Sequence, residues 1–364
     1  MLRDLEAFTT LETPSTEKKL LDAFADYLAR YAGGLEATSV DIIPQTVAGN
    51  HVRMHWAHSA PATGRPILVL AHFDTVWPAG TLKEIPFSVR DGVVRGPGVF
   101  DMKAGLVQGL WALRALLSGS RQYRSVTLVC NSDEEIGSET SRALIEDEAR
   151  KADAVFVLEP SLAGALKTSR KGQGTFSIDV QGRAAHAGLD PDAGISAVHE
   201  LARIVPELVE LADPSQGTTV NVGVIAGGTR SNVVAASAHA EVDIRIRTAA
   251  EADRVSAGIR ALRPSRAGLR LHVAGGLTRP PLERTTGVAR LYEQARSLAS
   301  EIDLDLREAA AGGASDGNFC AAVGIPVLDG LGAVGGGAHA PDEHVIVDEM
   351  PRRAALLAAL LEHQ

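Results

Sequence analysis

The sequence predicts an α/β fold that is interrupted by a smaller α+β domain. Three short apolar segments end at a histidine or an acid, which is typical of buried strands in an open α/β sheet: residues 67–70, 125–130 and 154–158. Between residues 174 and 273, the predicted strands instead alternate apolar and polar residues, as strands with one exposed face do. A length of 364 residues exceeds what one core usually serves, so we expect two domains.

The composition restricts the class of protein. With 45% hydrophobic and 22% charged residues, it is that of an ordinary soluble globular chain. A formal net charge of −9 argues against a nucleic-acid or anionic-membrane partner. No apolar run reaches the length of a membrane span, and the first six residues carry acids where a signal peptide would be apolar. Two cysteines cannot form a disulfide framework, so we expect a cytoplasmic protein.

The first part of the chain predicts helices around these strands. The spacing of apolar residues predicts a helix over residues 16–31, and Pro14 to Glu17 resemble a helix start. An extended region follows over residues 40–56. Residues 92–98 are predicted to form a glycine-rich turn, and residues 105–117 a buried helix.

The middle of the chain predicts a separate β-α-β-β-α-β unit. Its strands are expected at residues 174–180, 218–225, 239–247 and 269–273, and its helices at 195–211 and 249–262. This order is typical of a small sandwich with helices on one face of a sheet. Helix and strand alternation then returns from residue 286, with a strand at 325–328 and a last amphipathic helix at 351–361. The small unit is therefore an insertion.

The ends of the predicted strands collect residues that bind metals. His72 and Asp74 are two residues apart at the end of a strand, so their side chains project to the same side. A carboxylate beside a histidine is a common way to orient a metal-binding imidazole. Together with the residues that end the other segments, the chain offers two imidazoles and three carboxylates, a mixture that suits zinc: His72, Asp101, Glu135, Glu159 and His339.

Five ligands of this kind are enough for two metals if one carboxylate bridges them. Each metal then has three protein ligands and keeps a position for water, which a catalytic zinc needs. Glu134 precedes Glu135 and can face the water as a general base. Taken singly these signals are weak, because a His-x-Asp pair is usually a surface hydrogen bond and a Glu-Glu pair is usually a solvated patch.

Two other kinds of site are disfavoured. The glycine run at residues 335–337 is typical of a flexible loop or a phosphate cradle, but no Gly-Lys-Ser/Thr follows any glycine run. Cys130 and Cys320 are expected to be buried small side chains. A cysteine protease would need a paired histidine, and nothing in the sequence favours one.

The motifs resemble those of the M20 metallopeptidases, and within them the glutamate carboxypeptidase group. The resemblance runs over nearly the whole chain and keeps the motif order: residues 71–76, 95–103, 133–138, 158–160, 182–188, 228–234, 315–316 and 337–343. It implies a zinc-peptidase-like catalytic domain with a mixed central sheet flanked by helices, formed by residues 1–166 and 278–364. Residues 167–277 would form an inserted ferredoxin-like lid and dimerisation domain.

The resemblance also implies roles in the metal site. Asp101 would bridge two Zn²⁺ ions per chain, with Co²⁺ or Mn²⁺ as substitutes. His72 and Glu159 would complete one metal site, and Glu135 and His339 the other. Glu134 would be the general base and Asp74 would orient His72. The peptide bond after Asp101 would be cis.

Further roles concern the substrate and a partner subunit. The resemblance implies that His186 reaches the active site of the other subunit in a homodimer and helps to stabilise the oxyanion. Asn232 and Arg245 would hold carboxylate and backbone groups of the substrate. Arg279 and Lys167 match positions that contact the substrate acid in relatives that release glutamate.

We therefore expect a dinuclear zinc amidohydrolase that releases a C-terminal amino acid, with glutamate favoured, from a small peptide or an N-acyl amino acid. An acetylornithine or succinyl-diaminopimelate type of deacylase is the alternative within enzymes. A non-catalytic binding protein is the alternative outside them, but no metal position is lost. The hippurate hydrolase branch is disfavoured because the chain lacks a His-x-Cys-Gly-His motif. Ala235 stands where many relatives have proline.

Overall fold

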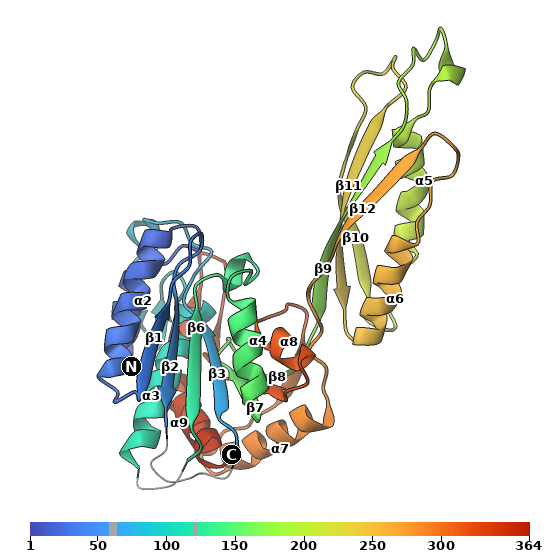
Figure 1. The fold of residues 1–364 in the computed structure, drawn as a ribbon. Coiled ribbons are helices and arrows are strands. Elements are labelled where there is room, and N and C mark those ends of the chain that lie inside the picture. Colours follow the sequence, from blue (N-terminus) through green and yellow to red (C-terminus); the bar gives the residue numbers. More distant parts are fainter. Residues whose placement is uncertain (58–63, 120–122) are drawn as a thin grey trace. The chain divides into compact units, whose positions relative to one another are not determined.

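The structure is a computed structural model that describes residues 1–57, 64–119 and 123–364. It divides into two compact units (Figure 1). Unit 1 consists of Met1–Ser169, Arg284–Ala311 and Ser315–Gln364, and unit 2 consists of Arg170–Glu283 and Gly312–Ala314. The chain therefore leaves unit 1, builds most of unit 2, and returns.

Unit 1 contains a six-stranded mixed sheet. Its order is β1 (Ser39–Ile43), β2 (His51–Trp56), β6 (Val126–Asn131), β3 (Ile67–His72), β7 (Ala154–Val157) and β14 (Val327–Leu328). The strands β6, β3, β7 and β14 run parallel, whereas β2 pairs antiparallel with both β1 and β6. Every residue of β3 is buried, because helices cover both faces of the sheet (Figure 1). The predicted mixed sheet flanked by helices is confirmed.

Unit 1 contains more helices than the sequence predicted. They are α1 (Leu2–Thr10), α2 (Lys18–Gly33), α3 (Ala104–Ser118), α4 (Arg142–Lys151), α7 (Thr286–Ser300), α8 (Gly317–Ala322) and α9 (Glu349–Glu362). Helix α1 was not predicted. It buries Leu5 and Phe8, and the ring centroids of Phe8 and Phe24 lie 5.4 Å apart in a T-shaped arrangement. Helix α2 begins at Lys18 without a side-chain cap, and Ser15 has another role described below.

Two small sheets complete unit 1. One has the order β15 (Gly335–Gly336), β16 (His344–Ile346), β5 (Val93–Arg95) and β4 (Ser88–Arg90), and the other pairs β8 (Leu166–Arg170) with β13 (Glu308–Ala311). The strand β5 lies where a plain turn was predicted. Its pairing with β16 aligns His344 with Arg95. The loops beside this pair, one before Asp101 and one after His339, are thereby held next to each other.

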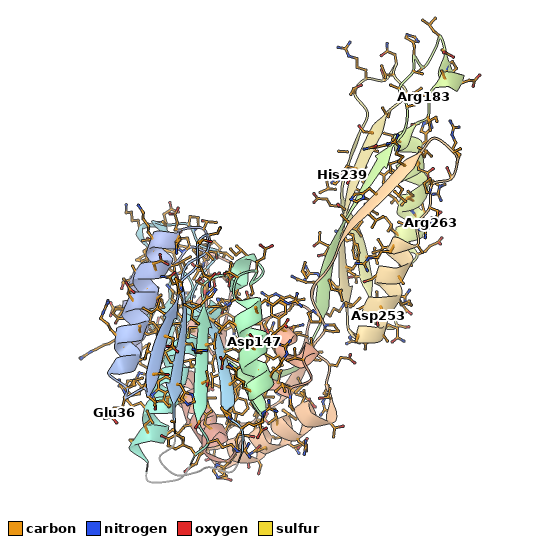
Figure 2. All side chains as sticks on the ribbon, in the orientation of Figure 1. Glu36, Asp147, Arg183, His239, Asp253 and Arg263 are labelled. Atoms are coloured by element: carbon orange, nitrogen blue, oxygen red, sulfur yellow. The ribbon has the colours of Figure 1, made fainter. Side chains whose placement is uncertain are left out.

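Unit 2 is an antiparallel sheet with two helices. Its elements are β9 (Gly172–Gln181), α5 (Ala197–Val209), β10 (Thr219–Gly227), β11 (Ser237–Ile246), α6 (Ala249–Arg260) and β12 (Arg270–Arg279), and its strand order is β10-β11-β9-β12. The predicted β-α-β-β-α-β unit is confirmed. Alternate strand residues such as Phe176 and Ile244 pack with helix residues such as Leu201 in a core of its own. The other face carries mostly polar residues, among them His239 (Figure 2), whose Nδ1 lies 2.9 Å from Oδ1 of Asp179.

The remaining regular elements are short turns: η1 (Thr81–Lys83), η2 (Val99–Lys103), η3 (Glu134–Ile136) and η4 (Pro191–Ala193). Of the helices in the described part of the chain, none has the length and apolar character that crossing a membrane requires.

Candidate metal centre

Three parallel strands bring their carboxyl ends together at one edge of the central sheet. The strand β3 ends at His72 and lies between β6 and β7. The loop after β6 carries Glu134 and Glu135 in the short turn η3, and the loop after β7 carries Glu159. Because these strands are parallel, the residues that follow them lie at the same edge.

Asp101 reaches this edge from the turn η2, which leads into α3. The peptide bond between Asp101 and Met102 is cis, as the resemblance implied. Just before it, Gly98 has φ +72°, and a Cβ atom there would lie 2.5 Å from Cγ2 of Thr75. A glycine is therefore needed for the η2 turn to approach the end of β3 so closely.

The side chains form two groups that share Asp101. His72 Nε2 lies 3.3 Å from Asp101 Oδ1 and 3.5 Å from Glu159 Oε1. His339 Nε2 lies 3.4 Å from Asp101 Oδ2 and 3.2 Å from Glu135 Oε1. Within each group the ligand atoms all lie within 4.8 Å of one another, and no other such group occurs in residues 1–57, 64–119 and 123–364.

Two atoms in the centre have unmet bonding capacity. His72 Nε2 and Asp101 Oδ1 are buried and have no hydrogen-bond partner in the part of the chain that the structure describes. Leaving a buried polar atom unsatisfied costs about 1–3 kcal/mol. A divalent cation would bond to both atoms at once, and imidazole with carboxylate is a donor set that zinc accepts. The residues therefore fit a metal.

The electrostatics show how strongly the centre attracts positive charge. Burial acts to lower the pKa of His72, but the carboxylates of Asp101, Asp74 and Glu159 outweigh it and raise that pKa well above 6.5. Hydrogen bonding to Asp101 and Glu135 raises the pKa of His339 to about 10. Without a metal, the two imidazoles would carry the positive charge. A metal must displace their protons, because only a neutral imidazole can be a ligand.

Asp74 connects the two sides of this centre. Its carboxylate accepts hydrogen bonds from the backbone N–H groups of Glu134 (3.1 Å) and Glu135 (3.2 Å) and from the hydroxyl of Ser15 (2.8 Å). Its Oδ1 lies 3.4 Å from Nδ1 of His72, and its backbone oxygen lies 3.1 Å from the same nitrogen. One buried residue therefore contacts both the histidine and the turn with the two glutamates.

Lys167 lies at the rim of the first group. It is buried on β8, and its Nζ is 3.9 Å from Glu159 Oε2. Lys167 belongs to unit 1, whereas the other three residues predicted to bind substrate belong to unit 2. Lys167 therefore lies beside Glu159 of the candidate metal centre.

His186 and Asn232 lie together in unit 2. The backbone N–H of Ala187 donates to the backbone oxygen of Asn232, and both predicted side chains are exposed. The N–H groups of Gly188 (3.1 Å) and Leu189 (3.0 Å) donate to Nδ1 of His186. Nδ1 is therefore an acceptor, which assigns the proton of the neutral ring to Nε2.

Arg245 and Arg279 lie at the other end of the same sheet. Both pair with Gln173, one from β11 and one from β12, so they flank it in a single row. Arg245 donates to Asp243 and to Gln173. From Ser237, where β11 begins beside the His186 loop, eight strand residues span roughly 27 Å to Arg245. The four residues thus form two separate pairs within unit 2.

Comparison with known proteins decides the family. Residues 68–363 match the sequence profile of peptidase family M20/M25/M40. The chain belongs to this family. It is accordingly an M20 metallopeptidase or amidohydrolase, and the resemblance in its motifs is confirmed.

Individual M20 proteins are similar over most of the chain. Carboxypeptidase G2 of Pseudomonas sp. (strain RS-16) is 32% identical over 307 residues, which cover 82% of this chain and 74% of the relative. Succinyl-diaminopimelate desuccinylase of Dechloromonas aromatica (strain RCB) is 29% identical over 338 residues, or 86% and 87% of the two chains. The crystal structure of aminopeptidase PepT from Bacillus cereus ATCC 10987 superimposes with a TM-score of 0.81 at 22% identity, covering 100% and 98%, and shares the fold.

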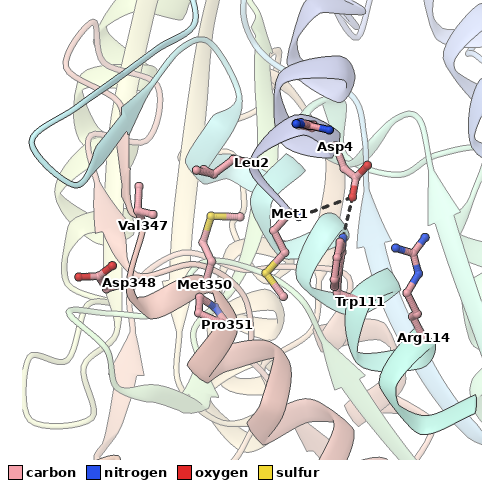
Figure 3. A pocket seen from close by; sticks show the side chains of 10 residues that line it. Met1, Leu2, Asp4, Trp111, Arg114, Val347, Asp348, Met350 and Pro351 are labelled. Carbon is pink, nitrogen blue, oxygen red and sulfur yellow. Dashed lines mark hydrogen bonds and ion pairs between the residues drawn. The ribbon is translucent and has the colours of Figure 1, made fainter. Parts of the chain in front are cut away.

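A separate hollow of about 650 Å³ lies between the N-terminal helix and the start of α9 (Figure 3). Asp4 there accepts a hydrogen bond of 2.6 Å from Nε1 of Trp111, and Arg114 stacks on the same indole at 4.7 Å. None of the candidate M20 site residues belongs to the described residues that line it. We assign this hollow no function.

Sequence reasoning missed the residues that support the centre from behind. Asp316 accepts hydrogen bonds from Asn131 (2.8 Å) and Ser138 (2.5 Å), and Asn131 also contacts Asp133 next to Glu134. Glu343 binds the backbone of the Asp101 turn. Asp316 and Glu343 both lie within motifs that the sequence analysis identified. However, no pattern in those motifs predicted these contacts.

Proposed function

We propose that the protein is a dinuclear metal-dependent amide hydrolase that releases a C-terminal amino acid, with glutamate favoured, from a small peptide or an N-acyl amino acid. The observation that carries this proposal is the sharing of Asp101 by two groups of three potential ligands. A shared carboxylate is the arrangement that suits two metals about 3.5–4 Å apart.

In this proposal His72, Glu159 and Asp101 hold one Zn²⁺, and Glu135, His339 and Asp101 hold the second, with Co²⁺ or Mn²⁺ as substitutes. Three protein ligands per ion leave a position for water or substrate. When bound, such ions polarise an amide carbonyl and lower the pKa of water. Protein side chains would carry out proton transfer, oxyanion stabilisation and substrate binding.

Glu134 serves as the general base and then as the general acid. It accepts a proton from the attacking water and passes it to the nitrogen of the departing amine. Its backbone is fixed by Asp74, which also orients His72. The neighbouring Glu135 is 3.2 Å from His339 and belongs to the metal group. Adjacent glutamates on one turn thus take different roles.

His186 donates a hydrogen bond to the developing oxyanion in the partner subunit of a homodimer. The assigned proton on Nε2 supports this role, because the neutral ring can donate from that atom while Nδ1 is held by two backbone N–H groups.

Cationic side chains would select an acidic substrate. Lys167 beside the first metal group, with Arg245 and Arg279 in one row, can pair with carboxylates, and Asn232 can bond to the substrate backbone. Similarity to carboxypeptidase G2 supports glutamate as the released residue. Similarity to succinyl-diaminopimelate desuccinylase, which extends over more of the chain, supports a deacylase as the second candidate.

A substrate panel distinguishes these candidates. Zinc-loaded and chelated protein would be assayed side by side on N-acyl-glutamate, N-succinyl-diaminopimelate, N-acetylornithine and dipeptides. We expect metal-dependent release of glutamate. Preference for the succinyl substrate would favour the second candidate, and the absence of hydrolysis in any metal-loaded sample would contradict an amide hydrolase.

A further inference from the structure

We propose that Glu343 is a positioning residue that fixes the backbone of Asp101 relative to the loop with His339, and so sets the spacing of the two metal groups. This inference rests on the proposed function, because it gives Asp101 its bridging place. Glu343 itself touches neither the substrate nor a metal. It acts through the segment that presents Asp101.

Four N–H groups converge on the carboxylate of Glu343. Its Oε1 accepts from the backbone of Phe100 (2.8 Å) and Asp101 (3.0 Å), and its Oε2 accepts from the backbone of Gly98 (2.8 Å) and from the indole of Trp77 (2.8 Å). The side chain is 2% exposed. Two oxygens with two donors each use the full acceptor capacity of an ionised carboxylate. Glu343 thereby fixes the backbone of Gly98, Phe100 and Asp101.

Backbone hydrogen bonds also fix the loop that carries Glu343 itself. Its N–H donates to the oxygen of Ala340 (2.9 Å), and the N–H of Ala340 donates to Gly337 (2.9 Å). Gly337 has φ +75°, and a Cβ there would lie 2.8 Å from the nitrogen of Glu343. The next residue, His344, pairs with Arg95 in the small sheet. His339 lies within this closed loop.

The consequence for the centre follows from the distances around Asp101. One oxygen of Asp101 lies 3.3 Å from His72 and the other lies 3.4 Å from His339. A movement of the Asp101 backbone would therefore alter both groups at once. Partners that orient metal ligands in this way typically contribute 10–100-fold to metal affinity. We expect an effect of about this size from Glu343.

The test is Glu343→Gln, because glutamine keeps the shape but turns an amide NH₂ group toward N–H donors. We expect Zn²⁺ affinity, measured by competition with a chromophoric chelator, to fall by roughly 10–100-fold. In the Co²⁺-substituted protein the visible absorption should change in position or intensity, since it reports the ligand geometry. Excess metal should restore part of kcat.

The matched control is Glu148→Gln, which alters another buried carboxylate that accepts hydrogen bonds from Arg53 and Lys151. We expect its metal affinity to be unchanged.

The outcomes separate the inference from the proposed function. If wild-type protein does not bind two ions per chain, the proposed function fails. If wild type binds two ions and folded Glu343→Gln binds them with the same affinity and the same Co²⁺ spectrum, the positioning role is wrong. Should Glu343→Gln not fold, as judged by circular dichroism, Trp77→Phe decides. It removes one of the four donors and should weaken Zn²⁺ binding in the same direction, and unchanged binding would overturn the inference.

Discussion

The carboxylate of Asp74 accepts a hydrogen bond of 3.1 Å from the backbone N–H of Glu134. The same carboxylate lies 3.4 Å from Nδ1 of His72. Because one buried carboxylate contacts both the proposed metal ligand His72 and the backbone of the proposed base, it ties the position of Glu134 to that of His72. The first prediction tests this connection.

Replacing Asp74 by asparagine should weaken both functions together. One of its oxygens becomes an NH₂ group, so it can no longer accept from Glu134 at Oδ1 or, in the other orientation, from Glu135 and Ser15 at Oδ2. We expect a loss of roughly 10–100-fold in kcat/KM together with weaker metal binding. Steady-state kinetics and metal titration measure the two effects. Ser15→Ala, which removes a single donor, should show a smaller effect, and an equally active Asp74→Asn enzyme would refute the connection.

Glu134→Gln should separate catalysis from metal binding. Glutamine keeps the shape but cannot accept a proton, so kcat should fall by roughly 10²–10⁴ while both metals stay bound. Glu135→Gln should instead lose metal affinity, because its carboxylate belongs to the group with His339. Metal analysis after gel filtration, combined with kinetics, distinguishes the two. Equal behaviour of the two variants would contradict their different roles.

The metal content itself should be about two divalent ions per chain. His72→Ala and His339→Ala each remove the imidazole from one group, so each should lower the content and abolish activity. Elemental analysis of extensively dialysed protein provides the measurement. Full content in a variant with His72, Asp101 and Glu135 all replaced by alanine would show that the ions bind elsewhere.

His186→Ala should keep both metals and the dimer but lose about 10²–10³ in kcat, the usual effect of one oxyanion donor. Mixing it with Glu134→Gln gives a sharper result. If His186 acts on the partner, a mixed dimer has one site with both defects and one with neither. Activity should recover to about a quarter of wild type after random exchange within a two-fold dimer. No recovery despite demonstrated subunit exchange would place His186 on its own chain or outside catalysis.

The pH dependence of stability should include a contribution from His51. Burial lowers its pKa below 6.5, although Asp133, Asp74 and Asp316 partly oppose this. Between its folded-state pKa and about pH 6.5, the imidazole of His51 therefore binds more protons in the unfolded chain than in the folded protein. The neutral imidazole of His51 makes its full contribution to the free energy of unfolding above pH 6.5. This contribution is lost as the pH falls through the folded-state pKa. The urea midpoint of wild type should fall relative to that of His51→Gln as the pH is lowered from 7 to 5, and the difference should stay constant above pH 7.

His51→Gln is a suitable comparison because it can keep both hydrogen bonds. The ring now accepts from the N–H of Ser132 and contacts the hydroxyl of Thr140 at 3.0 Å. Glutamine offers one acceptor and one donor group without titrating. Both proteins share the other titrating groups, and Asp133, whose pKa His51 helps to lower below 3.8, titrates outside the range of pH 5–7. A difference in midpoint that does not vary with pH would exclude His51 as the source.

The parts of the fold that the sequence predicted best are those with a repeating pattern. The end of β3 at His72 and the six elements of unit 2 follow from apolar runs and alternation. Helix α4 buries few residues, so its apolar stripe is too narrow to detect. Helix α1 is only nine residues long. Both helices form because they pack against the rest of unit 1, which a local pattern does not record.

Within the candidate centre, residue type and strand position predicted the side chains that meet, but not what supports them. Ser15 was interpreted as part of a helix start, whereas its hydroxyl donates to Asp74 across 59 positions of sequence. Glu343 bonds to the N–H of Asp101 across 242 positions. Such contacts depend on the register of distant loops and leave no periodic signature.

The order of the two metal groups along the chain has a consequence during synthesis. The group of His72, Asp101 and Glu159 is complete before the ribosome reaches unit 2, whereas the other group waits for His339. At typical rates of translation, this interval lasts roughly 10–35 s. During this interval a nascent chain contains all three residues of the first proposed group, whereas the second proposed group lacks only His339. If the proposed centre is correct, the site of His72, Asp101 and Glu159 would therefore be the first that an ion could meet.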